Sequence, residues 1–274
     1  MVNIKKLPLT KQKELAQNEN TPGEILSQLA FEQEELSRLV AKNPNTPIKI
    51  LEKLSRKFYE EVIDNPVFEL LLLENGARYW LKLCLAKSVK TPVETLEKLS
   101  CDRNLAIRGA VAENISTPVD VLCSLSEDEK SSVCLASARN PNTPADVLKN
   151  LAHSEQICFH YAVAKNPSTP VDVLESLGRD LFCLAVTENL NTPINVLNTL
   201  FKNIDFPTRH RLAKNPSTLP NVLTSLAQDQ DVFIRVTVAE NINTPVIILE
   251  QLQHDDRAYV RETVAERLKD RSSN

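Results

Sequence analysis

A repeated motif, Ala-x-Asn-x-x-Thr-Pro-x-x-x-Leu-x-x-Leu, runs through almost all of the 274 residues and limits the folds open to the chain. Each copy is anchored by a threonine, and leucines follow that threonine at +5 and +8. Successive anchors are separated by 25, 45, 26, 26, 26, 23, 26 and 26 residues, so the longest interval hides a degenerate copy. A period of this size is typical of a solenoid, in which each unit buries its apolar face against its neighbours. The anchors are Thr21, Thr46, Thr91, Thr117, Thr143, Thr169, Thr192, Thr218 and Thr244.

The copy around Thr169 predicts a helix that starts at a Thr-Pro corner. We expect the Thr169 hydroxyl to act as the N-cap and to accept from an N–H of the first turn. Pro170 then falls at the first helical position, where a missing N–H costs nothing. Asp172 completes a capping box and favours the positive end of the helix. Val173 and Leu174 begin the apolar stripe that this helix must bury.

Residues upstream of the same corner predict the end of a second helix. Alanine occupies the position of Ala164 in eight of the nine copies, which indicates close approach between helices. Asn166 is suited to a left-handed helix end or an Asx turn, and Pro167 prevents the helix from continuing. Each repeat is therefore predicted to be a helix, a tight corner and a second helix.

The repeats predict a single α-solenoid over residues 1–270. The interval between Thr46 and Thr91 contains an Asn65-Pro66 corner without its Thr-Pro cap, and we interpret it as an irregular repeat. The predicted parts are an N-terminal cap at 1–20, regular repeats at 21–55, the irregular repeat at 56–90, regular repeats at 91–254, a C-terminal capping helix at 255–270 and a polar tail at 271–274.

Composition narrows the function classes. The net charge is −4 and the pI is near 5.7, which argues against a basic surface over the whole molecule. No apolar run approaches the length of a membrane span, and no signal-peptide core is visible, so we expect a cytoplasmic protein. The six cysteines include no Cys-x-x-Cys pair, and we expect them to be reduced thiols without a cofactor.

The corner Asn-Pro-Asn-Thr-Pro at 140–144, with Val-Arg-x-x-Val-Ala at 260–265, resembles the leucine-rich repeat variant family. That resemblance covers nearly the whole chain. It implies a right-handed superhelix of two-helix repeats of about 22–26 residues, in which α-helices alternate with shorter α or 3₁₀ helices, without strands. One member of that family holds an iron–sulfur centre in an N-terminal cysteine cluster. Here the first cysteine is Cys84, so the cofactor does not carry over, and the family implies no catalytic residue.

A column of cations lies nine residues before the anchors and predicts a stripe on one surface. One interpretation is that the stripe binds a nucleic acid or another polyanion. The interpretation that we favour is a ladder of Arg–Asp pairs between repeats, with Asp102, Asp205, Asp231 and Asp256 as acceptors. Cys134, His160 and Cys183 occupy the middle of the column, but repeats about 8–10 Å apart would hold them too far from one another for a shared metal ion. The candidate stripe is Lys82, Arg108, Arg209, Arg235 and Arg261.

The irregular repeat concentrates aromatic residues and is the candidate site for a protein partner. Exposed aromatic side chains at a break in periodicity would form a binding hot spot. The alternative, which we slightly favour, is that the rings fill the space left by the shortened corner. The residues are Phe58, Tyr59, Phe68, Tyr79 and Trp80.

A basic patch around Phe206-Pro207 could engage acidic ligands, and a solvated helix face explains it equally well. It comprises Lys202, Arg209, His210, Arg211 and Lys214.

Phosphate loops, metal-binding His pairs and nucleophile elbows are absent from the sequence, so we expect no catalysis. The leading hypothesis is a scaffold that binds a protein partner through a repeat surface, and the alternative is a polyanion binder.

Overall fold

The computed structural model describes residues 4–75, 78–179 and 182–272. Within these ranges the chain forms 21 α-helices, one short 3₁₀ helix at Ile4–Lys6 and no strand. The chain divides into two compact units, Met1–Asn140 and Pro141–Asn274. We call a helix that leads into a corner an A helix and one that follows a corner a B helix.

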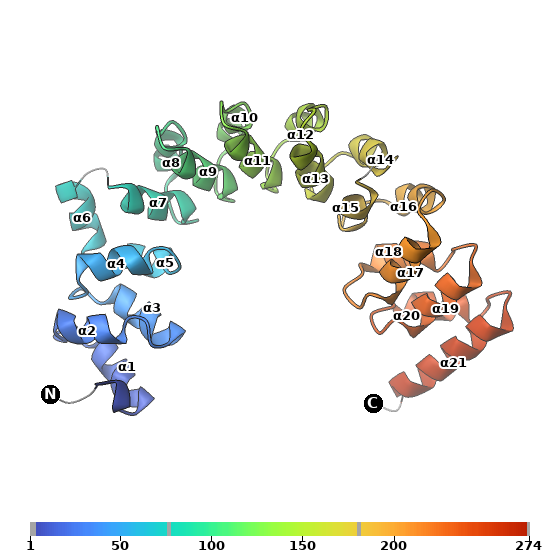
Figure 1. The fold of residues 1–274 in the computed structure, drawn as a ribbon, viewed down its shortest axis with the longest axis horizontal. Helices are drawn as coiled ribbons and strands as arrows, with labels where there is room; N and C mark the ends of the chain where they lie inside the picture. The colour runs from blue at the N-terminus through green and yellow to red at the C-terminus, as the bar shows by residue number, and fades with distance from the viewer. Residues whose placement is uncertain (1–3, 76–77, 180–181, 273–274) are drawn as a thin grey trace. The chain divides into compact units, whose positions relative to one another are not determined.

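In the first unit, A helices pack on A helices and most B helices lie beside them in a second layer (Figure 1). The A helices are α1 (Leu9–Gln17), α3 (Glu34–Lys42), α5 (Tyr59–Ile63), α7 (Tyr79–Lys87), α9 (Leu105–Glu113) and α11 (Ser131–Arg139). The B helices are α2 (Gly23–Leu29), α4 (Ile48–Leu54), α6 (Phe68–Asn75), α8 (Val93–Ser100) and α10 (Val119–Ser126).

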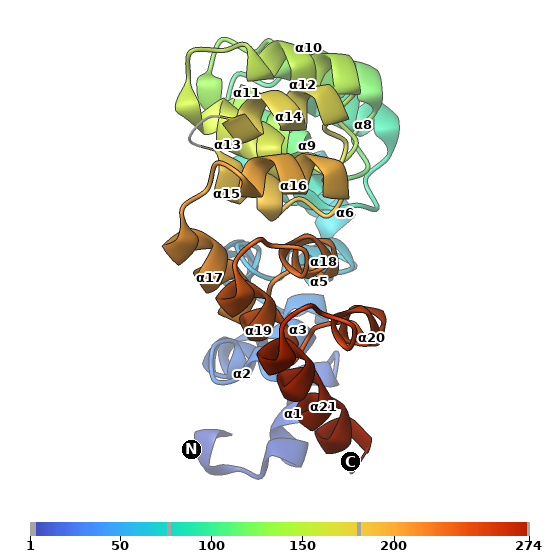
Figure 2. The same cartoon turned by 90° about the vertical axis from the view of Figure 1, so that its right-hand side faces the viewer.

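The second unit repeats the two-layer arrangement, which Figure 2 shows from a second direction. Its A helices are α13 (Ile157–Lys165), α15 (Cys183–Thr187), α17 (Phe206–Lys214), α19 (Val232–Glu240) and α21 (Ala258–Ser272). Its B helices are α12 (Ala145–Ala152), α14 (Val171–Arg179), α16 (Ile194–Phe201), α18 (Pro220–Leu226) and α20 (Val246–Leu252). The predicted all-α repeat fold is therefore confirmed.

The corner threonines do not cap the B helices, so that prediction was wrong. The Thr169 hydroxyl donates to the carbonyl of Val163, six residues earlier and at the end of the preceding A helix, over 2.5 Å. The same bond recurs in other copies, for example from Thr117 to Val111. At these corners proline is the N-cap, as Pro118 shows with φ −60° and ψ 152°. The proline ring fixes φ near this value, and the threonine hydroxyl ties the corner back to the helix before it.

Corner asparagines link each repeat to the one before. The side-chain amide of Asn114 donates to the carbonyls of Ala86 and Ser88, both at 2.8 Å. Its Oδ1 accepts from the Ser116 N–H at 2.9 Å, which forms the predicted Asx turn. The backbone is extended, with φ −71° and ψ 123°, so the left-handed alternative is wrong. The same pair of amide bonds, which we call the asparagine ladder, is made by Asn43, Asn65, Asn140, Asn189 and Asn241.

The ladder also explains why alanine recurs at the same position in most copies of the motif. Ala86 and Ala112 are fully buried, and their carbonyls accept from asparagines 28 residues later. A larger side chain at this position would hold the next A helix farther away. The prediction of close approach is confirmed for these helices.

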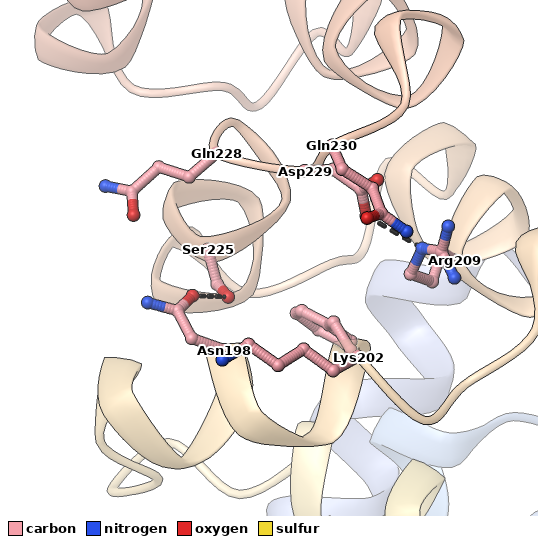
Figure 3. Close-up of a pocket in the computed structure, with 8 residues that line it drawn as sticks. Asn198, Lys202, Arg209, Ser225, Gln228, Asp229 and Gln230 are labelled. Carbon is pink, nitrogen blue, oxygen red and sulfur yellow. Dashed lines mark hydrogen bonds and ion pairs between the residues drawn. The ribbon is translucent and has the colours of Figure 1, made fainter.

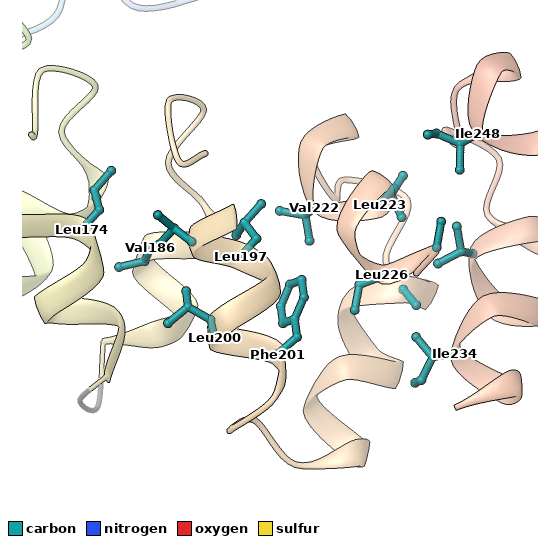
Figure 4. Packing of buried hydrophobic residues seen from close by; sticks show 14 of the residues in the cluster. Leu174, Val186, Leu197, Leu200, Phe201, Val222, Leu223, Leu226, Ile234 and Ile248 are labelled. Atoms are coloured by element: carbon teal, nitrogen blue, oxygen red, sulfur yellow. The ribbon is translucent and has the colours of Figure 1, made fainter. Parts of the chain in front are cut away.

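The core lies between the two layers and is built from the leucines of the motif. In the second unit Leu174, Leu197 and Leu223 are fully buried in one cluster (Figure 4). Gly178 lets α14 lie close to α16, because a Cβ at this position would collide with the Leu200 side chain. Burial of this stripe is what stabilises B helices of seven to nine residues, which would not persist alone.

Two further predictions concern the A helices near the C-terminal end. Asp231 caps α19 as predicted, and its carboxylate accepts from the Phe233 N–H at 2.9 Å. Ile234, Val238 and Ala239 are fully buried, as the apolar stripe predicted.

Candidate functional site

The predicted cation column forms ion pairs that run from each A helix to the loop that follows the next B helix. Arg108 binds Asp128 through Nε at 2.6 Å and Nη2 at 2.9 Å. Its Nη1 also donates to the carbonyl of Asp102 at 2.9 Å. Arg235 repeats the arrangement with Asp255, at 2.7 and 2.9 Å. Each arginine thus joins an acceptor 20 residues later.

The remaining members of the column differ in exposure. Lys82 is partly exposed and donates to Asp102 at 2.6 Å. Arg209 is nine-tenths buried and its Nε donates to Asp229 at 2.7 Å. Arg261 is exposed, and its Nη1 donates to the carbonyl of Asp255 at 2.6 Å.

The acceptors expected from the sequence were only partly right. Asp102 and Asp256 accept side-chain bonds from the column, but Asp231 caps a helix instead. The ion pairs depress the pKa of the carboxylates. The hydrogen bond from Arg108 lowers the pKa of Asp128, and the bond from Arg235 lowers that of Asp255.

Where the residue 20 positions later is not an aspartate, the column position is not an arginine. Cys134 replaces arginine, Ser154 stands 20 residues later, and the Cys134 thiol donates to the carbonyl of Asp128 at 3.1 Å. The ring of His160 packs edge-on against Phe182, with 5.1 Å between ring centroids, and Cys183 is half-buried. The described residues contain no cluster of three or more His, Cys, Asp or Glu side chains suited to a metal ion.

The aromatic residues of the irregular repeat lie mostly in the core of the first unit. Phe58, Phe68 and Trp80 are buried, with 3–8% exposure, and belong to its apolar cluster. Tyr59 is half-buried under the Lys87 ammonium, 5.9 Å from the ring centroid. Tyr79 is 46% exposed. The rings therefore fill space around the shortened corner, and a binding role for the five residues stays a prediction.

The asparagine ladder is interrupted in the second unit. Asn215 occupies the ladder position but is exposed, and across the described parts of the chain its amide donates to no carbonyl of the preceding repeat. The preceding A helix, α15, has only five residues. In most copies the ninth residue after the anchor is small, but in α16 it is Phe201, which is buried between Leu197 and Leu226 (Figure 4). The large Phe201 ring therefore occurs between Asn189, which makes the ladder bonds, and Asn215, which does not.

A pocket of about 370 Å³ opens beside Phe201 (Figure 3). We call it the Phe201 pocket. Lys202 and Arg209 line it together with Asp229, and the Ser225 hydroxyl bonds to Oδ1 of Asn198 at its edge. The other lining residues are Gln228 and Gln230. The pocket is therefore lined by two cations, one carboxylate and neutral polar side chains beside the apolar Phe201 ring.

A second pocket, of about 390 Å³, adjoins the first at Gln230. We call it the aromatic groove. Its walls include Phe233 at the start of α19 and Tyr259 at the start of α21, which are 62% and 57% exposed. Arg257 and Asp256 lie at its rim and are also exposed. Exposed aromatic rings beside charged groups are the composition that protein-binding hot spots favour.

Sequence reasoning located part of this site. Lys202 and Arg209 belong to the basic patch proposed around Phe206-Pro207, while His210 of that patch stacks on Phe206 at 5.8 Å. The groove residues Phe233 and Tyr259 were missed. The signal was present, because both rings occupy the second position of an A helix, 26 residues apart.

The helical pairs, the asparagine ladder and the arginine–aspartate pairs define an all-α repeat protein. Comparison with solved structures finds a leucine-rich repeat variant, described as having a novel repetitive structural motif. The two chains are 20% identical over 79% of this chain and 86% of the other, with a TM-score of 0.44. No family model matches the sequence, and no curated protein matches it. The description of that structure names the same family that the corner motif of this chain resembles. The structural similarity carries no evidence about binding.

Proposed function

We propose that the chain is a non-catalytic scaffold that binds a protein partner through the aromatic groove and the adjoining Phe201 pocket. The observation that carries the proposal is the exposed pair Phe233 and Tyr259, placed at equivalent positions of successive repeats around one groove. Aromatic side chains bury large apolar area at small entropic cost, so exposed rings in a groove are favourable anchors. Protein partners fit this surface better than small substrates, since both pockets are open to solvent and their walls are part polar and part apolar.

The charges of the groove support a partner that is neutral or acidic. Arg257 is exposed at the groove and Lys202 at the Phe201 pocket, whereas Arg209 and Arg235 are largely neutralised by Asp229 and Asp255. Neutralisation also bears on the alternative, a polyanion bound by the cation column. Counterion release needs cations that are free to contact phosphates, and three arginines of the column already donate to carboxylates. The polyanion alternative stays a prediction that salt dependence would test.

A cytoplasmic location is part of the same proposal. All six cysteines are free thiols, which suits a reducing compartment. Among the described residues, no helix has the length and apolar character needed to cross a membrane.

The test is an affinity pull-down of the tagged protein with mass spectrometry, run with and without nuclease. The wild-type chain is compared with Phe233→Ser/Tyr259→Ser and with the control Ile157→Ser. Ile157 is 66% exposed at the start of α13 and lines neither pocket, so it matches the groove residues in exposure and helix layer.

We expect a protein partner that survives nuclease, is lost with the double variant and is kept by the control. A partner that the double variant retains would remove the groove from the proposal. Recovery that disappears with nuclease would favour the polyanion alternative instead. Circular dichroism of both variants should match the wild type, because all three positions are exposed.

A further inference from the structure

We propose that the Phe201 pocket binds a carboxylate group, with Arg209 and Lys202 as its donors. The first support is the hydrogen bonding of Arg209. In Arg108 and Arg235, Nη2 donates to an Asp oxygen at 2.9 Å. Nη2 of Arg209 has no acceptor among the described residues, although the side chain is nine-tenths buried and lines the pocket.

The second support is a local change of sequence. An acidic residue follows the paired aspartate after Asp128 and Asp255, namely Glu129 and Asp256. Asp256 accepts from Nη2 of Arg235 at 2.7 Å, so the second acid provides a further acceptor for that guanidinium group. Gln230 takes this position after Asp229. The repeat of Arg209 therefore lacks the carboxylate that its equivalents carry, and a ligand can supply one.

Charge and size indicate the kind of anion. Lys202, Arg209 and Asp229 leave one net positive charge in a pocket of about 370 Å³. Lys202, the C-cap residue of α16, is exposed, and its side chain runs along the pocket toward Asn198 (Figure 3). One net positive charge matches a monoanionic carboxylate better than a phosphate dianion, whose second charge would face Asp229. The amides of Asn198, Gln228 and Gln230 add neutral donors at the wall.

The carboxylate site deepens the proposed function, because the pocket adjoins the aromatic groove at Gln230. An acidic side chain of a bound protein and a free carboxylic acid share the required chemistry. The test uses probes that need no protein partner, so the carboxylate site and the proposed function can fail separately.

The experiment is an NMR titration of the side-chain amides of Asn198, Gln228 and Gln230. The probes are the blocked peptide acetyl-Gly-Asp-Gly-amide, its neutral counterpart acetyl-Gly-Asn-Gly-amide, the monoanion propionate and inorganic phosphate. We expect saturable shifts with the Asp peptide and none with the Asn peptide. Tighter binding of propionate than of the Asp peptide would assign the site to a free acid, and the reverse would assign it to an acidic side chain.

The diagnostic variant is Gln230→Glu, which restores the acid found at Glu129 and Asp256 and so should fold normally. It should weaken binding of the carboxylate probes by about tenfold or more, because the new carboxylate competes for Nη2 of Arg209. Gln230→Ala removes one neutral donor and adds no charge, so it should weaken binding clearly less than Gln230→Glu does. Equal binding by Gln230→Glu and wild type would overturn the proposal, as would phosphate binding more tightly than either carboxylate.

Discussion

At the scale of the residue, a single asparagine carries much of the coupling between repeats. Its amide has two N–H donors. In Asn140 one donates to the Ala112 carbonyl in the last turn of the preceding A helix, and the other donates to the carbonyl of the corner residue Asn114, which also accepts from the Thr117 N–H. Serine is too short to make both bonds, and at Ser88 the hydroxyl only accepts from the Lys90 N–H at 3.2 Å. Aspartate has no donor at neutral pH. Asparagine is therefore the residue whose length and donors both fit.

Asn114→Ala should lower the free energy of unfolding by about 1–3 kcal/mol, because the buried Ala86 carbonyl loses its donor and the Ser88 carbonyl keeps only the Thr91 N–H. Asn215→Ala is the matched control at the interrupted position and should cost about 1 kcal/mol or less, since its side chain is exposed. Urea denaturation followed by circular dichroism measures both. Equal losses at the two positions would contradict the ladder.

Replacing Thr169 separates the observed bond from the predicted cap. Thr169→Ala should cost about 1 kcal/mol through the lost bond to Val163. Thr169→Ser keeps a donor and should recover most of that loss. Thr169→Asp has an acceptor only, so it should remain destabilised even though aspartate is a good N-cap. Thermal unfolding would instead rank Asp near wild type if the residue were a cap.

At the scale of the element, short A helices are held by ion pairs as well as by packing. Their arginines are buried where they meet the loop after the next B helix, and Asp128 and Asp255 accept from both the guanidinium and a backbone N–H. Removing one member leaves the other buried and unpaired, which is costly. The pairs therefore fix the register of neighbouring repeats.

The lowered pKa of Asp128 and Asp255 gives a pH dependence. A carboxylate whose pKa is depressed by folding contributes stability above its unfolded pKa of about 3.9, and the contribution is lost as pH falls through the folded pKa. The melting temperature should therefore fall steadily below about pH 5. The gap between wild type and Asp128→Asn should narrow over the same range. A gap that stays constant from neutral to acid pH would exclude this account.

The sequence predicted the elements well because the period and the leucines specify them. It placed the α19 cap at Asp231 and the buried stripe at Ile234 correctly. It assigned the threonine locally, as a cap, because a motif shows spacing and not the direction of a hydrogen bond. The asparagine acceptors lie 22–28 residues away, and such contacts are not visible in one copy of a repeat.

The site was harder to predict than the fold. The aromatic cluster around Trp80 was conspicuous in the sequence, yet its large rings are mostly buried. The Phe201 pocket opens beside a ring at a position that is small in most copies. In the same unit, Asn215 keeps the identity of a ladder asparagine but lacks the ladder bonds among the described residues. Only the packing of neighbouring repeats distinguishes Asn215 from Asn241.

At the scale of the whole molecule, repetition provides the framework and departures from repetition provide the candidate site. Regular copies are joined by the same asparagine bonds, and the same threonine bond ties each of their corners to the A helix before it. In the second unit, Phe201 and Gln230 break that regularity at one pocket, and Asn215 breaks it at the end of α17. A repeat protein can bind through such a place without loss of its core, because each repeat depends on its neighbours alone.

The most direct measurement is site-specific photo-crosslinking in the native cell, with benzoylphenylalanine placed at Phe233 or at Ile157. Both positions are exposed at the start of an A helix, and only Phe233 lies in the aromatic groove. We predict a discrete crosslinked protein from position 233 and none from position 157. The same crosslinked product from both positions, or a product from position 157 alone, would contradict the claim that this groove is the binding surface.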